Sequence, residues 1–364
     1  MPKISLCMIT RDDEDFIDLT IENLKDIVEE IIVVDTGSRD NTRDVAKKYG
    51  AVVCNYIWCD DFSKVRNYSF SVANEDFILW MDAGEYFNEA NIKKLKDLIL
   101  SLNDDIDAIY MKKVIEEGSD GQEIKYIISP RIVRKESKIR WQGEAVEFLD
   151  VKGKQVKDTD IKINASKKKL GSERYQIIKE RLDNNFTISI KEKMYYAQLL
   201  MKNYKDREAL LLYREIMRDE NEMVDDYYYL ETSLNLAEYY LKKKDIGGFK
   251  EYLFKSYEYG KPIAKSYFLL GEYFYNKCEY EKAIYWYAEA EGLDINFSYD
   301  NQIDTSYKNT FIYGQLSLCY SKIGDFNMAK FYNDKLALYN ENSPIVKYNR
   351  RSIKKTNYYI GENI

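Results

Sequence analysis

The chain has 364 residues, 45% of them apolar, which is long enough for two domains with cores of their own. Its 55 basic and 62 acidic residues give a net charge of −7 without a basic stripe, so we exclude nucleic acid as a partner. The sequence contains no histidine, which excludes every mechanism that uses imidazole as a base, a nucleophile or a metal ligand.

The cysteine content and the apolar runs bear on the compartment. An odd number of cysteines, five, in a long chain indicates reduced thiols rather than a disulfide framework. The amino terminus lacks the pattern of a signal peptide, and no apolar run approaches the roughly 18 residues that a membrane-spanning helix needs. We therefore expect a cytoplasmic protein without a membrane span.

Apolar runs alternate with amphipathic stretches from residue 4 to about residue 100, which is the pattern of strand–helix–strand units in a parallel sheet. Asp40 or Asn41 is placed to cap the second helix, and Gly50 to end it. Asp35 and Asp82 each follow a buried strand, so the sequence predicts an α/β, doubly wound, mostly parallel sheet with both acids at its ligand-binding edge. We expect strands over residues 4–9, 30–34, 51–56, 77–81 and 106–114, and the first helix over residues 16–28.

After about residue 170 only helices are expected, so we divide the chain into residues 1–170 and residues 171–364. Leu270, Gly271, Ala283 and Tyr287 have the spacing of one tetratricopeptide-like hairpin, in which small residues let two antiparallel helices approach each other. Equivalent positions recur at residues 209, 249, 283 and 329, in steps of 40, 34 and 46 residues. The prediction is an all-α helical-repeat domain, and the alternative is an ordinary helical bundle with tyrosines in its core.

Four motifs follow one another in the first half of the chain. They are residues 6–14 (LCMITRDDE), 30–42 (EIIVVDTGSRDNT), 58–67 (WCDDFSKVRN) and 78–85 (ILWMDAGE). In order and spacing they resemble the family-2 glycosyltransferases, over roughly residues 3–150. The resemblance is greatest to the bacterial subgroup with carboxy-terminal tetratricopeptide repeats, which includes the peptide S-glycosyltransferases that modify bacteriocins such as sublancin. It implies a GT-A-type, Rossmann-like fold and a nucleotide-sugar donor, for which a UDP-sugar is the first expectation.

The resemblance also implies roles for individual residues. Thr10 would end the first strand beside the nucleotide, Asp35 would accept from the uracil or another base, and Arg66 would reach the base or the phosphates. Asp82 would be the first acid of the family's Asp-x-Asp motif. Two local alternatives remain open: Asp35 caps the loop that follows it, and Arg66 pairs with Asp60 or Asp61.

Two departures from the family pattern concern the divalent cation, Mn²⁺ or Mg²⁺, that the family uses. Gly84 stands where the motif has its second Asp, and Val146 stands where the family has a His. Any cation would then rely on Asp82 and Glu85, because magnesium often keeps several waters and few protein ligands. The work of neutralising charge would otherwise fall on Asp82, Glu85, Arg66 or a helix terminus.

The resemblance implies an inverting transfer in one displacement, for which the base must be an Asp or Glu because the chain has no His. Glu144 and Glu147 follow Gly143 and are the candidates, although both could be solvated surface residues. Three interpretations stay open: an active enzyme with an altered site, a pseudoenzyme that binds a nucleotide-sugar or a partner, and an altered variant of an active parent.

The helical repeats suggest an acceptor. Stacked helical hairpins form a concave surface that suits an extended chain, and tyrosines on it can stack on peptide side chains or on a sugar ring. We therefore expect a protein or peptide acceptor. The alternative is that the repeats only hold a homodimer together.

Overall fold

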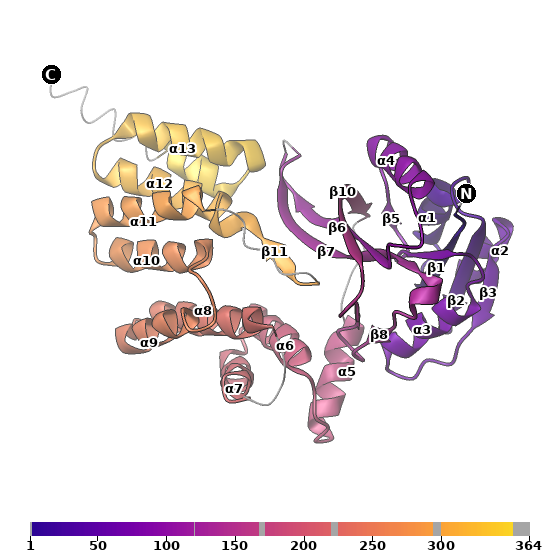
Figure 1. The fold of residues 1–364 in the computed structure, drawn as a ribbon. Helices are drawn as coiled ribbons and strands as arrows, with labels where there is room; N and C mark the ends of the chain where they lie inside the picture. The colour runs from indigo at the N-terminus through magenta and orange to yellow at the C-terminus, as the bar shows by residue number, and fades with distance from the viewer. Residues whose placement is uncertain (1, 120, 167–171, 220–224, 294–299, 352–364) are drawn as a thin grey trace. The chain divides into compact units, whose positions relative to one another are not determined.

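The computed structural model describes residues 2–119, 121–166, 172–219, 225–293 and 300–351 (Figure 1). The chain forms two compact units. The N-terminal unit comprises Met1–Ile115, Ile127–Glu192 and Tyr299–Asn301, and the helical unit comprises Glu116–Tyr126, Lys193–Ser298 and Gln302–Ile364. The division into one domain over residues 1–170 and a second over residues 171–364 stays a prediction.

The N-terminal unit is built on a mostly parallel, mixed sheet flanked by helices, as the sequence predicts. The sheet has the strand order β3-β2-β1-β4-β7-β6-β10-β5, and β8 pairs with β9 in a small separate ribbon. Its elements are β1 (Ile4–Thr10), α1 (Ile17–Leu24), β2 (Glu30–Asp35), α2 (Thr42–Lys48), β3 (Val52–Asn55), α3 (Phe62–Val72), β4 (Phe77–Trp80), β5 (Glu85–Tyr86), α4 (Glu89–Leu100), β6 (Ala108–Glu117), β7 (Glu123–Arg134), the 3₁₀ turn Lys135–Ser137, β8 (Trp141–Gln142), β9 (Phe148–Leu149), β10 (Val156–Ala165) and α5 (Ser172–Asp183), with the tips of β6 and β7 belonging to the helical unit.

Strand direction changes across the sheet. The strands β1, β2, β3 and β4 are parallel to one another, with Thr10 opposite Asp35 in the register of β1 and β2. Beyond β4 the sheet is mixed, because β7 is antiparallel to β4 while β10 is parallel to β6 and antiparallel to β5. The strands of this mixed half other than β6 were not predicted. The parallel half follows from strand–helix alternation, whereas a long antiparallel hairpin lacks that signal.

Alternation of side chains along β1 divides the core of this unit in two. Leu6 and Met8 face one side, where they pack in a cluster with side chains of α1, α2 and α4. Cys7 faces the other side and packs in a cluster with Val65 and Phe70 of α3. Successive residues of a strand point to opposite faces, so helices cover both faces of the sheet. This arrangement leaves the carboxyl ends of β1, β2 and β4 at one edge.

The helical unit consists of antiparallel hairpins that repeat along the chain. In the described residues these are α6 (Ile190–Lys202) with α7 (Asp206–Ile216), α8 (Asp226–Lys242) with α9 (Ile246–Ser256), α10 (Ala264–Asn276) with α11 (Tyr280–Gly292), and α12 (Thr310–Lys322) with α13 (Phe326–Tyr339), while β11 (Gln302–Asp304) and the 3₁₀ turn Thr305–Tyr307 precede α12. Each hairpin turn has three residues, and the middle one has a left-handed backbone. These middle residues are Tyr204, Lys244, Cys278 and Gly324, with φ between 59° and 85°. Their spacing reproduces the steps of 40, 34 and 46 residues.

The hairpin of α10 and α11 shows why the repeat needs small residues. A Cβ at Gly271 would lie 2.3 Å from Cε1 of Tyr287, whose ring is fully buried between the two helices. Ala283, Ala290 and Leu316 bury their side chains in the same cluster. The helical prediction is therefore confirmed. No helix in the described part of the chain is long and apolar enough to cross a membrane.

Candidate functional site

Three of the predicted site residues follow neighbouring parallel strands. Thr10 ends β1, Asp35 ends β2, and Asp82 comes two residues after the end of β4. Thr10 and Asp35 are almost fully buried, whereas Asp82 keeps 32% of its side chain exposed. Ligands of open parallel sheets bind at this edge, and Asp82 is the residue among these three whose side chain is exposed enough to meet a ligand.

Asp35 is engaged in its own loop. Its Oδ1 accepts hydrogen bonds from the backbone N–H groups of Gly37 and Ser38, both at 3.1 Å, and the hydroxyl of Ser38 donates to Oδ2. Gly37 has a φ of +105°, which favours glycine at this turn. The capping alternative is thus present in the structure, and a contact between Asp35 and a nucleobase stays a prediction.

Arg66 lies between two acids and two indole rings. It projects from α3, donates from Nη2 to Oδ1 of Asp82 at 2.8 Å, and from Nε to Oε1 of Glu147 at 3.1 Å. Its guanidinium carbon is 4.8 Å from the ring centre of Trp80 and 4.7 Å from that of Trp141. These cation–π contacts fix the direction of a side chain that is only 5% exposed.

The alternative pairing of Arg66 with the acids before α3 is not observed. Asp61 is instead the N-cap of α3, where its Oδ1 accepts from the backbone N–H of Lys64 at 3.0 Å. Asp60 accepts from the indole N–H of Trp58 at 2.7 Å. Arg66 therefore forms its ion pair with Asp82, sixteen residues further along the chain.

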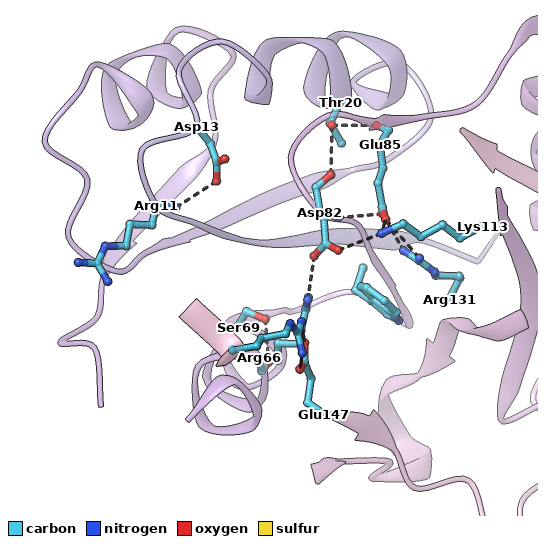
Figure 2. Close-up of polar contacts among 12 residues, drawn as sticks. Arg11, Asp13, Thr20, Arg66, Ser69, Asp82, Glu85, Lys113, Arg131 and Glu147 are labelled. Carbon is cyan, nitrogen blue, oxygen red and sulfur yellow. Dashed lines mark hydrogen bonds and ion pairs between the residues drawn. The ribbon is translucent and has the colours of Figure 1, made fainter. Parts of the chain in front are cut away.

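Lys113 bridges the two acids that the sequence offers as metal ligands (Figure 2). Its Nζ lies 2.5 Å from Oε1 of Glu85 and 3.5 Å from Oδ2 of Asp82. Glu85 also accepts from Arg131, whose Nη1 lies 2.7 Å from Oε2 and whose Nη2 lies 3.3 Å from Oε1. Arg131 stacks on Trp80 at 3.8 Å. The carboxylate of Glu85 is therefore held from two sides by cations.

The neighbouring cations decide the protonation of these acids. Burial would raise the pKa of Asp82, but Arg66 and then Lys113 outweigh it and hold this pKa well below its usual range. Burial likewise opposes ionisation of Glu85, and Arg131 and Lys113 outweigh it, so the pKa of Glu85 is lowered. Both acids are carboxylates at neutral pH and cannot donate a proton to a leaving group.

Glu147, predicted as a base, forms a buried ion pair. Arg174 donates to both of its oxygens, with Nη2 at 2.8 Å from Oε1, and Arg66 donates to Oε1 as well. Burial would raise the pKa of Glu147, but Arg174 and Arg66 outweigh it and lower the pKa. A carboxylate with a lowered pKa is a weak base, so this geometry favours Glu147 as a residue that positions the two arginines. Its role as a base stays a prediction.

Glu144, the second candidate base, is different. Its side chain is 46% exposed and forms an ion pair with Arg181 of α5. The loop that carries both glutamates is fixed by its backbone, because Arg174 donates to the carbonyl of Ala145 at 2.6 Å and Glu192 accepts from the N–H of Ala145 at 3.1 Å. The structure thus holds the loop firmly and leaves Glu144 nearer to solvent.

The residues present do not fit the divalent cation that the family implies. Gly84 offers no side chain, and the two acids on either side of it, Asp82 and Glu85, already bind Lys113. In the part of the chain that the structure describes, no three His, Cys, Asp or Glu side chains converge on a point where a metal ion could be held. The prediction that Asp82 and Glu85 together hold a cation is therefore not supported by this geometry, because a lysine ammonium lies between them.

Sequence reasoning found one cation of the site, Arg66, and missed Lys113, Arg131 and Arg174. Among the described residues the linked ion pairs join four cations, Arg66, Lys113, Arg131 and Arg174, to three carboxylates, Asp82, Glu85 and Glu147. The signals available were charged residues inside strand sequences, the two lysines of MKKV and the arginine of ISPRIV. The cluster carries an excess of one positive charge at an edge where an anionic ligand would bind.

Comparison with known proteins finds a family match in the first half of the chain. Residues 5–151 match the sequence model of the family described as Glycosyl transferase family 2, so this part of the chain is similar to that family. A TPR repeat-containing protein of Synechococcus elongatus is 37% identical over 150 residues, which are 41% of this chain and 36% of that protein. An uncharacterized glycosyltransferase of Rickettsia typhi is 31% identical over 115 residues, which are 32% of this chain and 39% of that protein.

These relatives extend well beyond the region of similarity. The chain spans less than two fifths of the length of each of them. Among solved structures, S. aureus TarS 1-349 in complex with UDP-GlcNAc is similar over 69% of this chain and 90% of that one, with 17% identity and a TM-score of 0.40. A likeness this distant carries no argument about the site.

Proposed function

We propose that the protein is a glycosyltransferase that moves a sugar from a nucleoside-diphosphate donor, in the first place a UDP-sugar, to a protein or peptide acceptor with inversion. One observation carries the proposal. Within the region that matches the family, Asp82 presents a partly exposed carboxylate between Arg66 and Lys113 at the carboxyl edge of the parallel strands. A transferase needs this combination, because its donor has both sugar hydroxyls and phosphates.

The reaction follows from the charges. The acceptor hydroxyl or thiol attacks the anomeric carbon, and its new bond to carbon forms as the bond from carbon to the β-phosphate oxygen breaks. The electron pair of the broken bond goes to the phosphate, where Arg66 and Lys113 are placed to meet the growing negative charge. The proton of the acceptor goes to a carboxylate, since the chain has no imidazole.

We propose Glu144 as the stronger candidate for that carboxylate. Its exposure lets an acceptor approach, whereas both oxygens of Glu147 already accept from guanidinium groups. A thiol acceptor would need the base less than a hydroxyl, because its pKa lies closer to neutrality. This would suit a bacteriocin-type peptide cysteine, which the sequence resemblance suggests.

The proposal of a peptide acceptor depends on the architecture of the helical unit. Its antiparallel hairpins repeat along the chain, and stacked hairpins can hold an extended chain on a concave surface. The ion pairs of Lys265 with Glu231 and Glu238, both at 3.6 Å, centre on a buried ammonium and belong to the interior of the unit. The alternative role of the repeats is to join two copies of the protein.

The competing proposal is a binding protein without catalysis. It is favoured by the three paired carboxylates of the site, Asp82, Glu85 and Glu147, each of which has a lowered pKa. A site whose acids all serve to hold cations would still attract a nucleotide. It would transfer nothing unless Glu144 or another acid accepts the proton.

Calorimetric titration and a donor-hydrolysis assay separate these proposals. The full chain is titrated with UDP and with UDP-glucose, UDP-galactose and UDP-N-acetylglucosamine, and release of UDP from each sugar is then followed. Binding with UDP release supports the transferase. Binding without release supports the non-catalytic protein. Absence of binding to every nucleotide would discard both proposals.

A further inference from the structure

We propose that the ammonium group of Lys113 takes the place of a divalent cation, so that this site binds a nucleoside diphosphate without a metal ion. The inference rests on the proposed function and names how its donor is held. It starts from the position of Lys113 Nζ between Glu85 and Asp82, the two acids on either side of Gly84.

The ammonium of Lys113 occupies the place between Asp82 and Glu85 that a divalent ion would need. Lys113 keeps 16% of its side chain exposed, and its Nζ is 2.5 Å from Glu85 and 3.5 Å from Asp82. Like charges at such separations repel strongly in a partly buried site. A divalent ion held by the same two carboxylates would therefore have to displace Lys113 first.

The turn that carries the two acids is built around a glycine. Gly84 has a φ of +87°, and a Cβ on it would lie 2.3 Å from the side-chain oxygen of Ser166. Its N–H donates to the hydroxyl of Thr20 at 2.9 Å, and that hydroxyl donates to the carbonyl of Glu85 at 2.8 Å. The position of the missing metal ligand is thus closed by packing and by backbone conformation.

Arg131 balances the negative charge of Glu85. It binds Glu85 through two nitrogens and neutralises it, so that the charge of Lys113 is shared with the partly exposed Asp82. Arg66 approaches Asp82 from the other side at 2.8 Å. Two cations therefore converge on the one exposed carboxylate, and their combined charge is what a diphosphate needs from its site.

During transfer these groups would act on the leaving group alone. As the bond between the anomeric carbon and the β-phosphate oxygen breaks, the electron pair stays on that oxygen, and Lys113 and Arg66 stabilise it by charge and hydrogen bonds. No proton has to move from either cation, because a diphosphate leaves as an anion. The step balances with the acceptor's proton on a carboxylate.

The test is calorimetric titration of UDP into the full chain in EDTA and, separately, in excess Mn²⁺. We expect the two dissociation constants to agree within about threefold, since a metal-bridged diphosphate would change the affinity by tenfold or more. Lys113→Gln should weaken UDP binding about tenfold or more through loss of a charge-assisted contact. Lys112→Gln, on the adjacent residue of the same strand, is the matched control and should bind UDP like the parent, because neighbouring strand residues point to opposite faces.

The outcomes separate the role of Lys113 from the proposed function. Binding of UDP in Mn²⁺ but not in EDTA would overturn the inference and leave the proposed function standing. Unchanged affinity of Lys113→Gln, with thermal unfolding showing a folded protein, would also overturn it. If that variant does not fold, Lys113→Arg, which keeps the charge, should retain metal-independent binding, and loss of binding there contradicts the inference. Failure of the parent to bind UDP under either condition would overturn the proposed function as well.

Discussion

The ammonium of Lys113 lies 2.5 Å from the buried carboxylate of Glu85, and this one contact changes how the site is understood. Glu85 comes three residues after Asp82, where the sequence offers two acids for a cation. The contact gives Glu85 a partner from a different strand, β6, and leaves Asp82 as the acid that faces a ligand.

Restoring the family's acid at residue 84 should damage the protein instead of creating a metal site. Gly84→Asp forces a side chain onto a left-handed backbone and against Ser166, which we expect to cost about 1–3 kcal/mol of unfolding free energy. Gly153→Asp is the matched control, because Gly153 has a φ of +72° with open space around it. Chemical denaturation measures both. A Gly84→Asp variant as stable as Gly153→Asp, with UDP affinity raised by Mn²⁺, would contradict this.

The parallel half of the sheet could be predicted from the sequence because its strands and helices alternate with clear periods. Asp35 and Asp82 were placed at strand ends for the same reason. Lys113 could not be placed, since either it or Lys112 would face the site depending on the register of β6. That register is set by pairing with β10, a strand about fifty residues away that has an irregularity between Asp158 and Lys162.

Acid should weaken the N-terminal unit through its ion-paired carboxylates. The folded-state pKa values of Asp82, Glu85 and Glu147 lie below those of the unfolded chain, about 4. Their contribution is thus fully present above that value and is lost as the pH falls through the folded-state values. We expect these three carboxylates to lower the thermal midpoint as the pH falls below about 4. A midpoint that stays constant or rises between about pH 4 and about pH 2 would exclude this account.

Glu147→Gln should lower both stability and UDP affinity, because it leaves Arg174 and Arg66 short of a buried counter-charge. We expect a loss of about 3–5 kcal/mol in unfolding free energy at neutral pH. Glu144→Gln, on the exposed glutamate of the same loop, should leave stability nearly unchanged and reduce transfer. Normal UDP binding by Glu147→Gln with transfer abolished would instead make Glu147 the base.

The helical unit contains a buried lysine, Lys265, and removing its charge should lower the free energy of unfolding. Lys265 has 7% of its side chain exposed, lies 3.6 Å from both Glu231 and Glu238, and donates to Asn235 at 2.5 Å. Lys265→Met would remove the buried counter-charge of Glu231 and leave Glu238 with Lys242 alone, and we expect a loss of about 3–5 kcal/mol. Lys330→Met breaks an exposed pair with Asp334 and should have no measurable effect on unfolding. Equal stability of the two variants would refute the argument.

The repeats were found from small residues at regular positions, and the hairpin turns explain why this worked. Each turn has a residue with a left-handed backbone in its middle. Gly324 is of the residue type that favours this conformation, whereas Tyr204, Lys244 and Cys278 are not. Buried alanines such as Ala283 carried the signal because helices cannot approach closely without them. The polar cluster around Lys265 has no such sequence period and became visible only in the fold.

The rate at which the full chain releases UDP from a UDP-sugar is the measurement that decides whether the protein is a glycosyltransferase. We expect release by the parent protein and by Asp97→Asn, a change on the exposed face of α4, and loss of release in Asp82→Asn with its thermal unfolding retained. If no UDP-sugar is hydrolysed or transferred by the parent, or if Asp82→Asn turns over at the parent's rate, the proposal of a glycosyltransferase centred on Asp82 is wrong.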